Sequence, residues 1–156
     1  MNYARGYPNL LNYGENLIFV FGGFNNSAKN EGILDNSVMV IEMYDISKDS
    51  FTDLKVKMKF PVFGCLSAIV GPTQILIAGG VTAKGEFHVF KENDSAYIIN
   101  LNDGKIQDLA PLPRPTWSVL PLIYRKNNSS FEFFINGEEL DGKLPENVSL
   151  TYKITN

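Results

Sequence analysis

The stretch that decides the fold is Leu17-Ile18-Phe19-Val20-Phe21-Gly22-Gly23, five apolar residues closed by a pair of glycines. A second stretch of this kind is Ile75-Leu76-Ile77-Ala78-Gly79-Gly80, and we call the interval from Gly22 to Gly79 one repeat. One repeat further on, Phe133-Phe134-Ile135 is followed by Asn136-Gly137. Asn tolerates a left-handed backbone better than most residues with a side chain, so this third copy keeps the turn without its first glycine. The sequence therefore predicts a repeat protein, and a period of this length is typical of an array of supersecondary units.

Further markers flank each glycine pair. Tyr44, Tyr97 and Tyr152 follow the pairs at nearly the same interval, and apolar Phe51 and Ile106 come seven and nine positions after the first two tyrosines. Short runs rich in β-branched and aromatic residues also precede the pairs, at residues 7–13, 63–70 and 117–124. Turn signals separate these runs, which predicts four short strands in each repeat. We expect an all-β chain with its second strands at residues 17–22, 75–79 and 132–136, and no helix longer than two turns.

The order of these markers resembles the kelch repeat, in which a double glycine ends the second strand, a Tyr lies in the third strand and a Trp follows about seven positions later in the fourth. Gly22-Gly23, Tyr44 and Phe51 fit this pattern with Phe in the Trp position, and the second repeat fits more loosely. The segment Leu112-Pro113-Arg114-Pro115 is similar to the kelch segment that leads into the next blade. The resemblance implies kelch-type β-propeller blades, each a four-stranded antiparallel sheet, at about residues 5–58, 60–110 and 115–156.

Three blades form only a partial ring, because propellers close with about 4–8 blades. The predicted strands end after the third strand of the last blade, so we expect the C-terminal half of a propeller of about six blades. The rest would come from an upstream segment, a second chain or self-association. An incomplete gene product with a three-stranded last blade is the alternative. An isolated half would expose apolar faces that include Leu10, Leu11, Phe133 and Ile135.

Composition argues against charged or lipid partners. Fourteen Lys and Arg against seventeen Asp and Glu give a net charge of −3, which disfavours binding to nucleic acid or to an anionic membrane surface. The apolar runs are five to eight residues long, short of the roughly 20 that a membrane-spanning helix needs. With no visible secretory signal and one cysteine, we expect a cytoplasmic protein.

Few residues suit catalysis or metal binding. His88 is the single histidine, so a copper site with two imidazoles cannot be assembled, and a hydrolase triad would depend on that one residue. Cys65 sits within an apolar run and is expected to be a buried thiol. The acidic turn that contains Glu138 and Asp141 lacks the ligand spacing of a calcium loop. We therefore expect no catalytic residue, no metal and no cofactor.

The long connections between second and third strands are the predicted binding surface. They span residues 24–36, 81–94 and 138–149, each over ten residues. Long loops on a rigid scaffold commonly carry binding residues. In a propeller they would emerge on the same face as the segments that lead into the next blade. The candidate binding residues are Phe24, Asn25, Asn26, Lys29, Lys84, Phe87, His88, Arg114, Glu138 and Asp141.

Three functional hypotheses remain open at this stage. The first is an intracellular protein-interaction module, a scaffold or adaptor that binds a protein or peptide through these loops. The second is a structural subunit of a larger assembly, for example a cytoskeletal one. The third is a sugar-processing isomerase of the kind that some kelch-like propellers resemble, with its ligand at the central channel.

Overall fold

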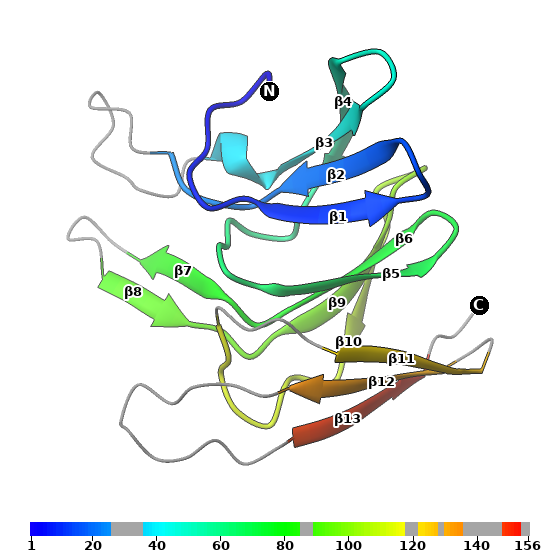
Figure 1. Cartoon of the computed structure of the whole chain (residues 1–156). Coiled ribbons are helices and arrows are strands. Elements are labelled where there is room, and N and C mark those ends of the chain that lie inside the picture. Colours follow the sequence, from blue (N-terminus) through cyan, green and yellow to red (C-terminus); the bar gives the residue numbers. More distant parts are fainter. Residues whose placement is uncertain (26–35, 85–88, 118–121, 128–129, 136–147, 154–156) are drawn as a thin grey trace.

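The computed structural model describes residues 1–25, 36–84, 89–117, 122–127, 130–135 and 148–153. Apart from one two-stranded hairpin, the described strands form three antiparallel sheets that follow one another along the chain and lie one beside the next (Figure 1). Sheet 1 has the order β1 (Asn9–Tyr13), β2 (Leu17–Phe21), β3 (Val40–Asp45) and β4 (Ser50–Lys57). Sheet 2 has the order β5 (Leu66–Gly71), β6 (Gln74–Ala78), β9 (Ala96–Asn100) and β10 (Ile106–Leu109). Sheet 3 has the order β11 (Leu122–Asn127), β12 (Ser130–Ile135) and β13 (Val148–Lys153).

The prediction of an all-β chain is confirmed for the described residues, and sheets 1 and 2 are four-stranded and antiparallel as predicted, whereas three strands of sheet 3 are described. Their one helical element is the 3-10 turn η1 (Asn36–Met39), which leads into β3. The predicted second strands are observed as β2, β6 and β12, and each ends at the residue before its glycine pair or Asn-Gly pair. Strand β6 is continuously apolar from Ile75 to Ala78 because both faces of sheet 2 are covered.

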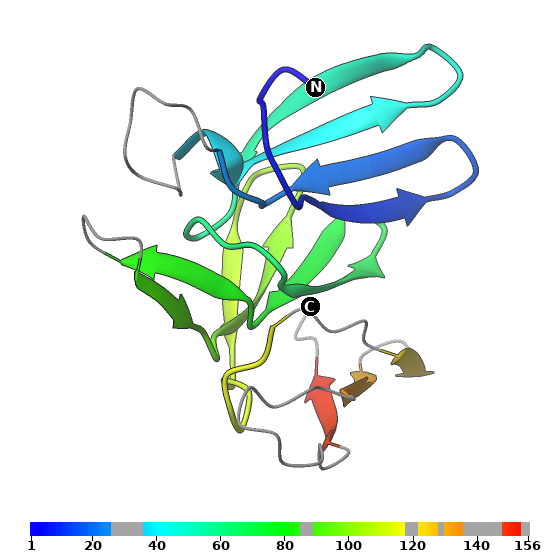
Figure 2. The ribbon, with the colours of Figure 1, turned by 60° about the vertical axis from the view of Figure 1, so that its left-hand side comes forward.

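Two details of the strand prediction are wrong. The first strands begin later than predicted, at Asn9, Leu66 and Leu122, and the aromatic residues at the heads of the three runs lie before them. The connection after β6 also contains a hairpin, β7 (Val81–Lys84) paired with β8 (Val89–Glu92). Both hairpin strands alternate in polarity or carry β-branched residues, so they can pair even within a connection. The hairpin projects from sheet 2 in both views (Figures 1 and 2).

The core between sheets 1 and 2 is built by strict alternation. Phe19 and Phe21 of β2 point toward sheet 2, where they meet Ile75, Ile77 and other buried residues of one cluster. The residues that alternate with them on β6, Leu76 and Ala78, belong to a second cluster on the opposite face of sheet 2. Sheet 2 therefore has two buried faces, which is the arrangement expected of an inner sheet in a stack.

The glycine pairs join each sheet to the next. Gly22 and Gly79 donate backbone hydrogen bonds to Val38 and Ser95, just before the third strand of their own sheets. Gly23 and Gly80 donate to Val62 and Thr116, in the segments that lead into the following sheets. All four glycines have φ between 65° and 90°, and an added Cβ would lie within 2.7 Å of a neighbouring atom at each. The structure thus confirms that these glycines are required by positive φ and close packing.

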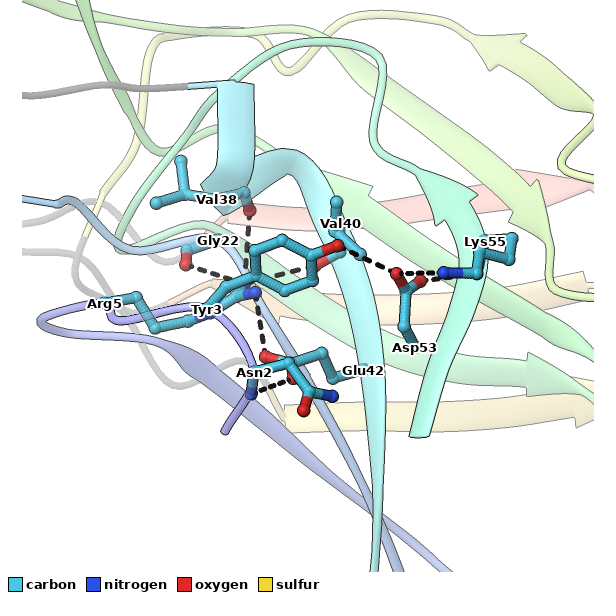
Figure 3. Close-up of polar contacts among 9 residues, drawn as sticks. All are labelled: Asn2, Tyr3, Arg5, Gly22, Val38, Val40, Glu42, Asp53 and Lys55. Atoms are coloured by element: carbon cyan, nitrogen blue, oxygen red, sulfur yellow. Dashed lines mark hydrogen bonds and ion pairs between the residues drawn. The ribbon is translucent and has the colours of Figure 1, made fainter. Parts of the chain in front are cut away.

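The outer face of sheet 1, which points away from sheet 2, is partly covered by the N-terminal residues. Arg5 forms a fully buried ion pair with Glu42 of β3 at 3.1 Å, and it also donates to the backbone oxygens of Gly22, Val38 and Val40 (Figure 3). Burial lowers the pKa of Arg5, and the carboxylate opposes that shift. Its Nε is the one buried side-chain nitrogen or oxygen of the described residues that lacks a hydrogen-bond partner. The N-terminal segment is therefore fixed to sheet 1 by a buried charge pair.

The apolar faces expected to be exposed are found only in part. Leu10 is 60% exposed on the outer face of sheet 1, as expected. Leu11 packs against the core between sheets 1 and 2, so its predicted exposure is wrong: successive residues of β1 point to opposite faces. The side chains of Phe133 and Ile135 lie outside the described residues.

Candidate binding pocket

A pocket of about 550 Å³ opens at one end of sheets 1 and 2. The strands β1 and β5 begin at this end, β2 and β6 finish there, and the segment into sheet 3 passes beside it. In Figure 1 this is the left-hand end, where the arrow of β2 points. The connections that follow β2 and β6 leave the sheets at this end. The lining of the pocket comprises Tyr7, Pro8, Asn9, Phe24, Phe63, Gly64 and Trp117.

Tyr7 forms the exposed rim of the pocket. Its side chain is 76% exposed and its φ is 50°, a left-handed conformation that is uncommon for a bulky residue. The residue one repeat later, Gly64, has φ of 60° and also lines the pocket. The repeat therefore requires a left-handed residue here, which glycine supplies without strain in sheet 2. In sheet 1 the chain holds a tyrosine in that conformation, and strain retained at a pocket is typical of functional sites.

Aromatic rings stack in series along the wall. The rings of Tyr7 and Phe24 are stacked with centroids 5.3 Å apart, and the edge of Phe24 meets Phe63 at 5.8 Å. Backbone pairing fixes both phenylalanines, since Gly6 and Phe24 exchange two hydrogen bonds, and Phe63 and Val81 do the same one repeat later. The Phe24 ring packs closely over Gly6, since a Cβ there would lie 3.3 Å from it. The wall is therefore a preformed apolar surface.

The pocket is apolar and uncharged as far as the described residues form it. Four of its seven lining residues are aromatic, and the one side-chain amide belongs to Asn9. That amide donates to the Cys65 thiol beneath it. Burial raises the pKa of Cys65 to about 12, so the thiol stays protonated and is not a nucleophile. The prediction that Cys65 is a buried thiol is confirmed.

The structure brings one of the ten predicted binding residues into the pocket, Phe24. Asn25 follows it and is half-buried, and Arg114 is half-buried in the segment before sheet 3, but neither lines the pocket. Lys84 ends β7, with its side chain outside the described residues. The other predicted binding residues also lie outside them: Asn26, Lys29, Phe87, His88, Glu138 and Asp141.

Sequence reasoning missed most of the lining. Tyr7, Phe63 and Trp117 head the three runs that were interpreted as first strands, and the structure places all three in the pocket instead. The signal was present, because an aromatic residue begins each of the three runs, although Tyr7 and Phe63 are not equivalent: one repeat before Phe63 stands Gly6. It was hidden because aromatic residues are also favoured within strands.

The described part of the chain contains no candidate metal site and no candidate membrane-spanning helix. No group of three or more His, Cys, Asp or Glu side chains is placed there to hold a metal ion. Nor does any helix within these residues have the length and apolar character to cross a membrane.

Comparisons with known proteins address the fold. No protein-family model matches the sequence, and no curated protein matches it. A solved structure of the protein YjhT superposes with a TM-score of 0.59 at 13% sequence identity and covers 83% of this chain. The chain spans about a third (34%) of the length of YjhT. At this identity the likeness shows a shared fold alone.

Proposed function

We propose that this chain is part of a kelch-type β-propeller that acts as a protein-interaction module in the cytoplasm. The aromatic pocket would hold apolar side chains of a protein or peptide partner. The observation that carries the proposal is the strained, exposed Tyr7 stacked over a preformed aromatic wall at the loop end of the sheets. Nothing else in the described residues combines exposure, strain and a pocket.

The recurrence of sheet contacts supports the propeller arrangement. Hydrogen bonds of Gly22 and Gly79, and the backbone pairs of Gly6 and Phe63, repeat with the period of the sequence. Consecutive sheets are joined in the same way, which is how blades follow one another in a propeller. The fold likeness to YjhT, a chain about three times longer, is compatible with a ring that contains more sheets.

The chemistry of the pocket favours an apolar peptide segment. A volume of about 550 Å³ lies within the usual range of ligand sites and accommodates more than one side chain. Flat aromatic walls suit proline, leucine or aromatic side chains, because such contacts bury apolar area with little loss of side-chain freedom. A phosphorylated or acidic ligand would find no cation among the described lining residues.

A structural subunit of a larger assembly is the second candidate. The half-covered outer face of sheet 1, with Leu10 exposed, favours it because such a face is built to pack against another sheet. The two roles are compatible, since the pocket and this face are different surfaces.

Peptide selection followed by fluorescence titration tests the proposed function. Trp117 is the single tryptophan of the chain and lines the pocket, so its emission reports on occupancy. Peptides selected from a random library against the wild-type chain should change that emission on binding. The variants Tyr7→Gly and Phe24→Ala should weaken binding by about tenfold or more, because each removes an aromatic wall.

Tyr7→Gly separates binding from folding. Glycine accepts the left-handed backbone, so this variant should melt at or near the wild-type temperature while its affinity falls. Leu10→Ala, an exposed substitution on another surface, is the control and should bind normally. Selected peptides that bind the wild type and both pocket variants equally would contradict the proposal.

A further inference from the structure

The outer face of sheet 1 corresponds, residue for residue, to a face of sheet 2 that sheet 1 covers. Val20 and Ile77 lie one repeat apart, and they pair within their sheets with Glu42 and Tyr97. Glu42 and Tyr97 thus occupy the same position. Tyr97 is 1% exposed and lies within the core between sheets 1 and 2. Its face is therefore the one that receives the preceding sheet.

The segments that precede the two sheets lie on these faces in the same way. The backbone N–H of Asn2 donates to Glu42 at 2.7 Å, and that of Lys59, one repeat later, donates to the Tyr97 hydroxyl at 3.4 Å. The N-terminal segment is therefore the counterpart of the segment that lies between sheets 1 and 2. It would lie inside a contact with another sheet and would not block that contact.

A second interaction, from the preceding segment to the fourth strand, is also found in both sheets. Asp53 of β4 and Asp108 of β10 pair with Glu42 and Tyr97, respectively. Asp53 accepts a hydrogen bond from Tyr3 at 2.9 Å, and Asp108 forms an ion pair with Lys59 at 2.6 Å. Figure 3 shows the first of these ties, with Tyr3 reaching across β3 to Asp53. The outer face of sheet 1 is thus constructed like a covered face.

The two faces differ in how far their apolar residues are buried. Ile75 and Leu101 pack in the core between sheets 1 and 2, whereas their counterparts Ile18 and Ile46 are half-buried and 48% exposed, respectively. Leu10 on the same outer face is 60% exposed. Leu10 and Ile46 are therefore exposed apolar residues on the face where sheet 1 would receive a preceding sheet.

The chain also carries the opposite half of such a contact. Phe133 and Ile135 of β12 lie one repeat after Leu76 and Ala78, which belong to the face of sheet 2 turned away from sheet 1. By register, the corresponding face of sheet 3 is the one that would meet a following sheet. The strand pairing places these residues on that face: Phe131, Phe133, Ile135, Val148, Leu150 and Tyr152.

We propose that the outer face of sheet 1 docks on sheet 3 of a second copy of this chain, so that two copies close one ring. Two chains of three sheets give a ring of about six, within the range of about 4–8 that propellers adopt. Each copy supplies both kinds of face, so both contacts form together and no face is left open. The proposal shares the propeller arrangement with the proposed function but makes no use of the pocket.

Light scattering on the purified chain tests this directly. The wild-type chain should have twice its mass of 17.4 kDa at micromolar concentration. Leu10→Asp and Ile46→Asp each place a charge on the outer face, and each should weaken the pair by about tenfold or more while the fold, followed by circular dichroism, is kept. Ile106→Asp is the matched control, since Ile106 is a 39% exposed residue of sheet 2 outside both faces, and it should stay paired.

Mixing two variants tests the head-to-tail arrangement. Leu10→Asp and Leu150→Asp change opposite faces, so a mixed pair keeps one of its two contacts intact and should form when neither variant pairs alone. If Leu150→Asp does not fold, light scattering of Leu10→Asp and Ile46→Asp still tests whether the outer face of sheet 1 forms the contact between the two copies. A monomeric wild type, pairing unaffected by both outer-face variants, or a mass that grows without limit as concentration rises would each overturn the proposal. Unaltered peptide binding by Leu10→Asp would leave the pocket proposal standing.

Discussion

The outer face of sheet 1 and the face of sheet 2 that contacts sheet 1 correspond by register, but different groups cover them. The difference shows that one face is stabilised by apolar packing and the other by a charge pair. On sheet 2 the position opposite Ile77 holds Tyr97, buried with its neighbours beneath sheet 1. On sheet 1 the same position holds Glu42, whose charge is neutralised by Arg5 of the N-terminal segment. The covered face is stabilised by apolar packing, and the outer face by a buried charge pair.

Substitution of Gly80, at the contact between sheets 1 and 2, should cause the largest loss of free energy of unfolding. A Cβ there would collide with Val62 Cγ2 and lie 2.9 Å from the oxygen of Phe63, and φ is 88°. Gly80→Val should lower the free energy of unfolding by about 4 kcal/mol, because backbone strain adds to overpacking. Denaturant unfolding measures it.

A control separates strain from packing. Gly104 has φ of 70° but nothing within 4 Å of an added Cβ. Gly104→Val should therefore cost only the strain, about 2 kcal/mol. Equal losses at both positions would show that Gly80 does not fix the approach of the sheets.

The same substitution at matched positions tests the contrast itself. Ile75→Ala opens a cavity beneath sheet 1 and should cost about 3 kcal/mol. Ile18→Ala, at the corresponding half-buried position, should cost about 1 kcal/mol in a dilute sample. Thermal unfolding of both variants over a range of protein concentrations is the measurement. If the second copy covers Ile18, its cost should rise with concentration while that of Ile75→Ala stays constant; equal costs in dilute solution would contradict the contrast.

The sequence was informative wherever the repeat is regular. The glycine pairs located the second strands, because their backbone conformation and packing recur with the period. The tyrosines indicated the third strands, but they occupy different positions there, since Tyr44 pairs with Ile18 and Tyr97 pairs with Ile77.

Arg5 and Glu42 could not be found this way: Val62 stands one repeat after Arg5, and Tyr97 occupies the position of Glu42 in sheet 2, so neither residue of the pair recurs. The sequence predicted only part of the pocket. Phe24 was predicted because it follows a glycine pair, whereas the place of Tyr7 in the pocket depends on a left-handed backbone that composition does not reveal.

Removing the charge pair should have a smaller effect than opening the core. Arg5→Met leaves Glu42 without its cation, but the N-terminal segment can detach and let water reach the carboxylate. We therefore expect a loss of about 2 kcal/mol, below the roughly 3–5 kcal/mol typical when one partner of a deeply enclosed pair is removed. Arg5→Met combined with Glu42→Leu should recover most of it, because no unpaired charge remains. Chemical unfolding of both variants is the measurement, and a double variant no more stable than Arg5→Met would show that the pair is not the main tie.

The smallest effect should be the acid sensitivity of the tie between Asp53 and the N-terminal segment. A hydrogen bond from the Lys55 side chain, with further bonds from the Lys55 backbone and from Tyr3, lowers the pKa of Asp53 from 3.8 to about 2. A carboxyl whose pKa is lowered on folding stabilises the fold above its unfolded value, and this contribution is lost as the pH falls from about 4 to about 2.

Because Lys55 is largely exposed, water screens the pair and we expect less than about 1 kcal/mol from it. Asp53→Asn should therefore be slightly less stable than the wild type at pH 6 and should lose less stability between pH 4 and pH 2. Denaturant unfolding at these three pH values is the measurement. Parallel pH profiles for the two proteins would show that the hydrogen bonds from Lys55 and Tyr3 do not stabilise the ionised Asp53 in the folded state.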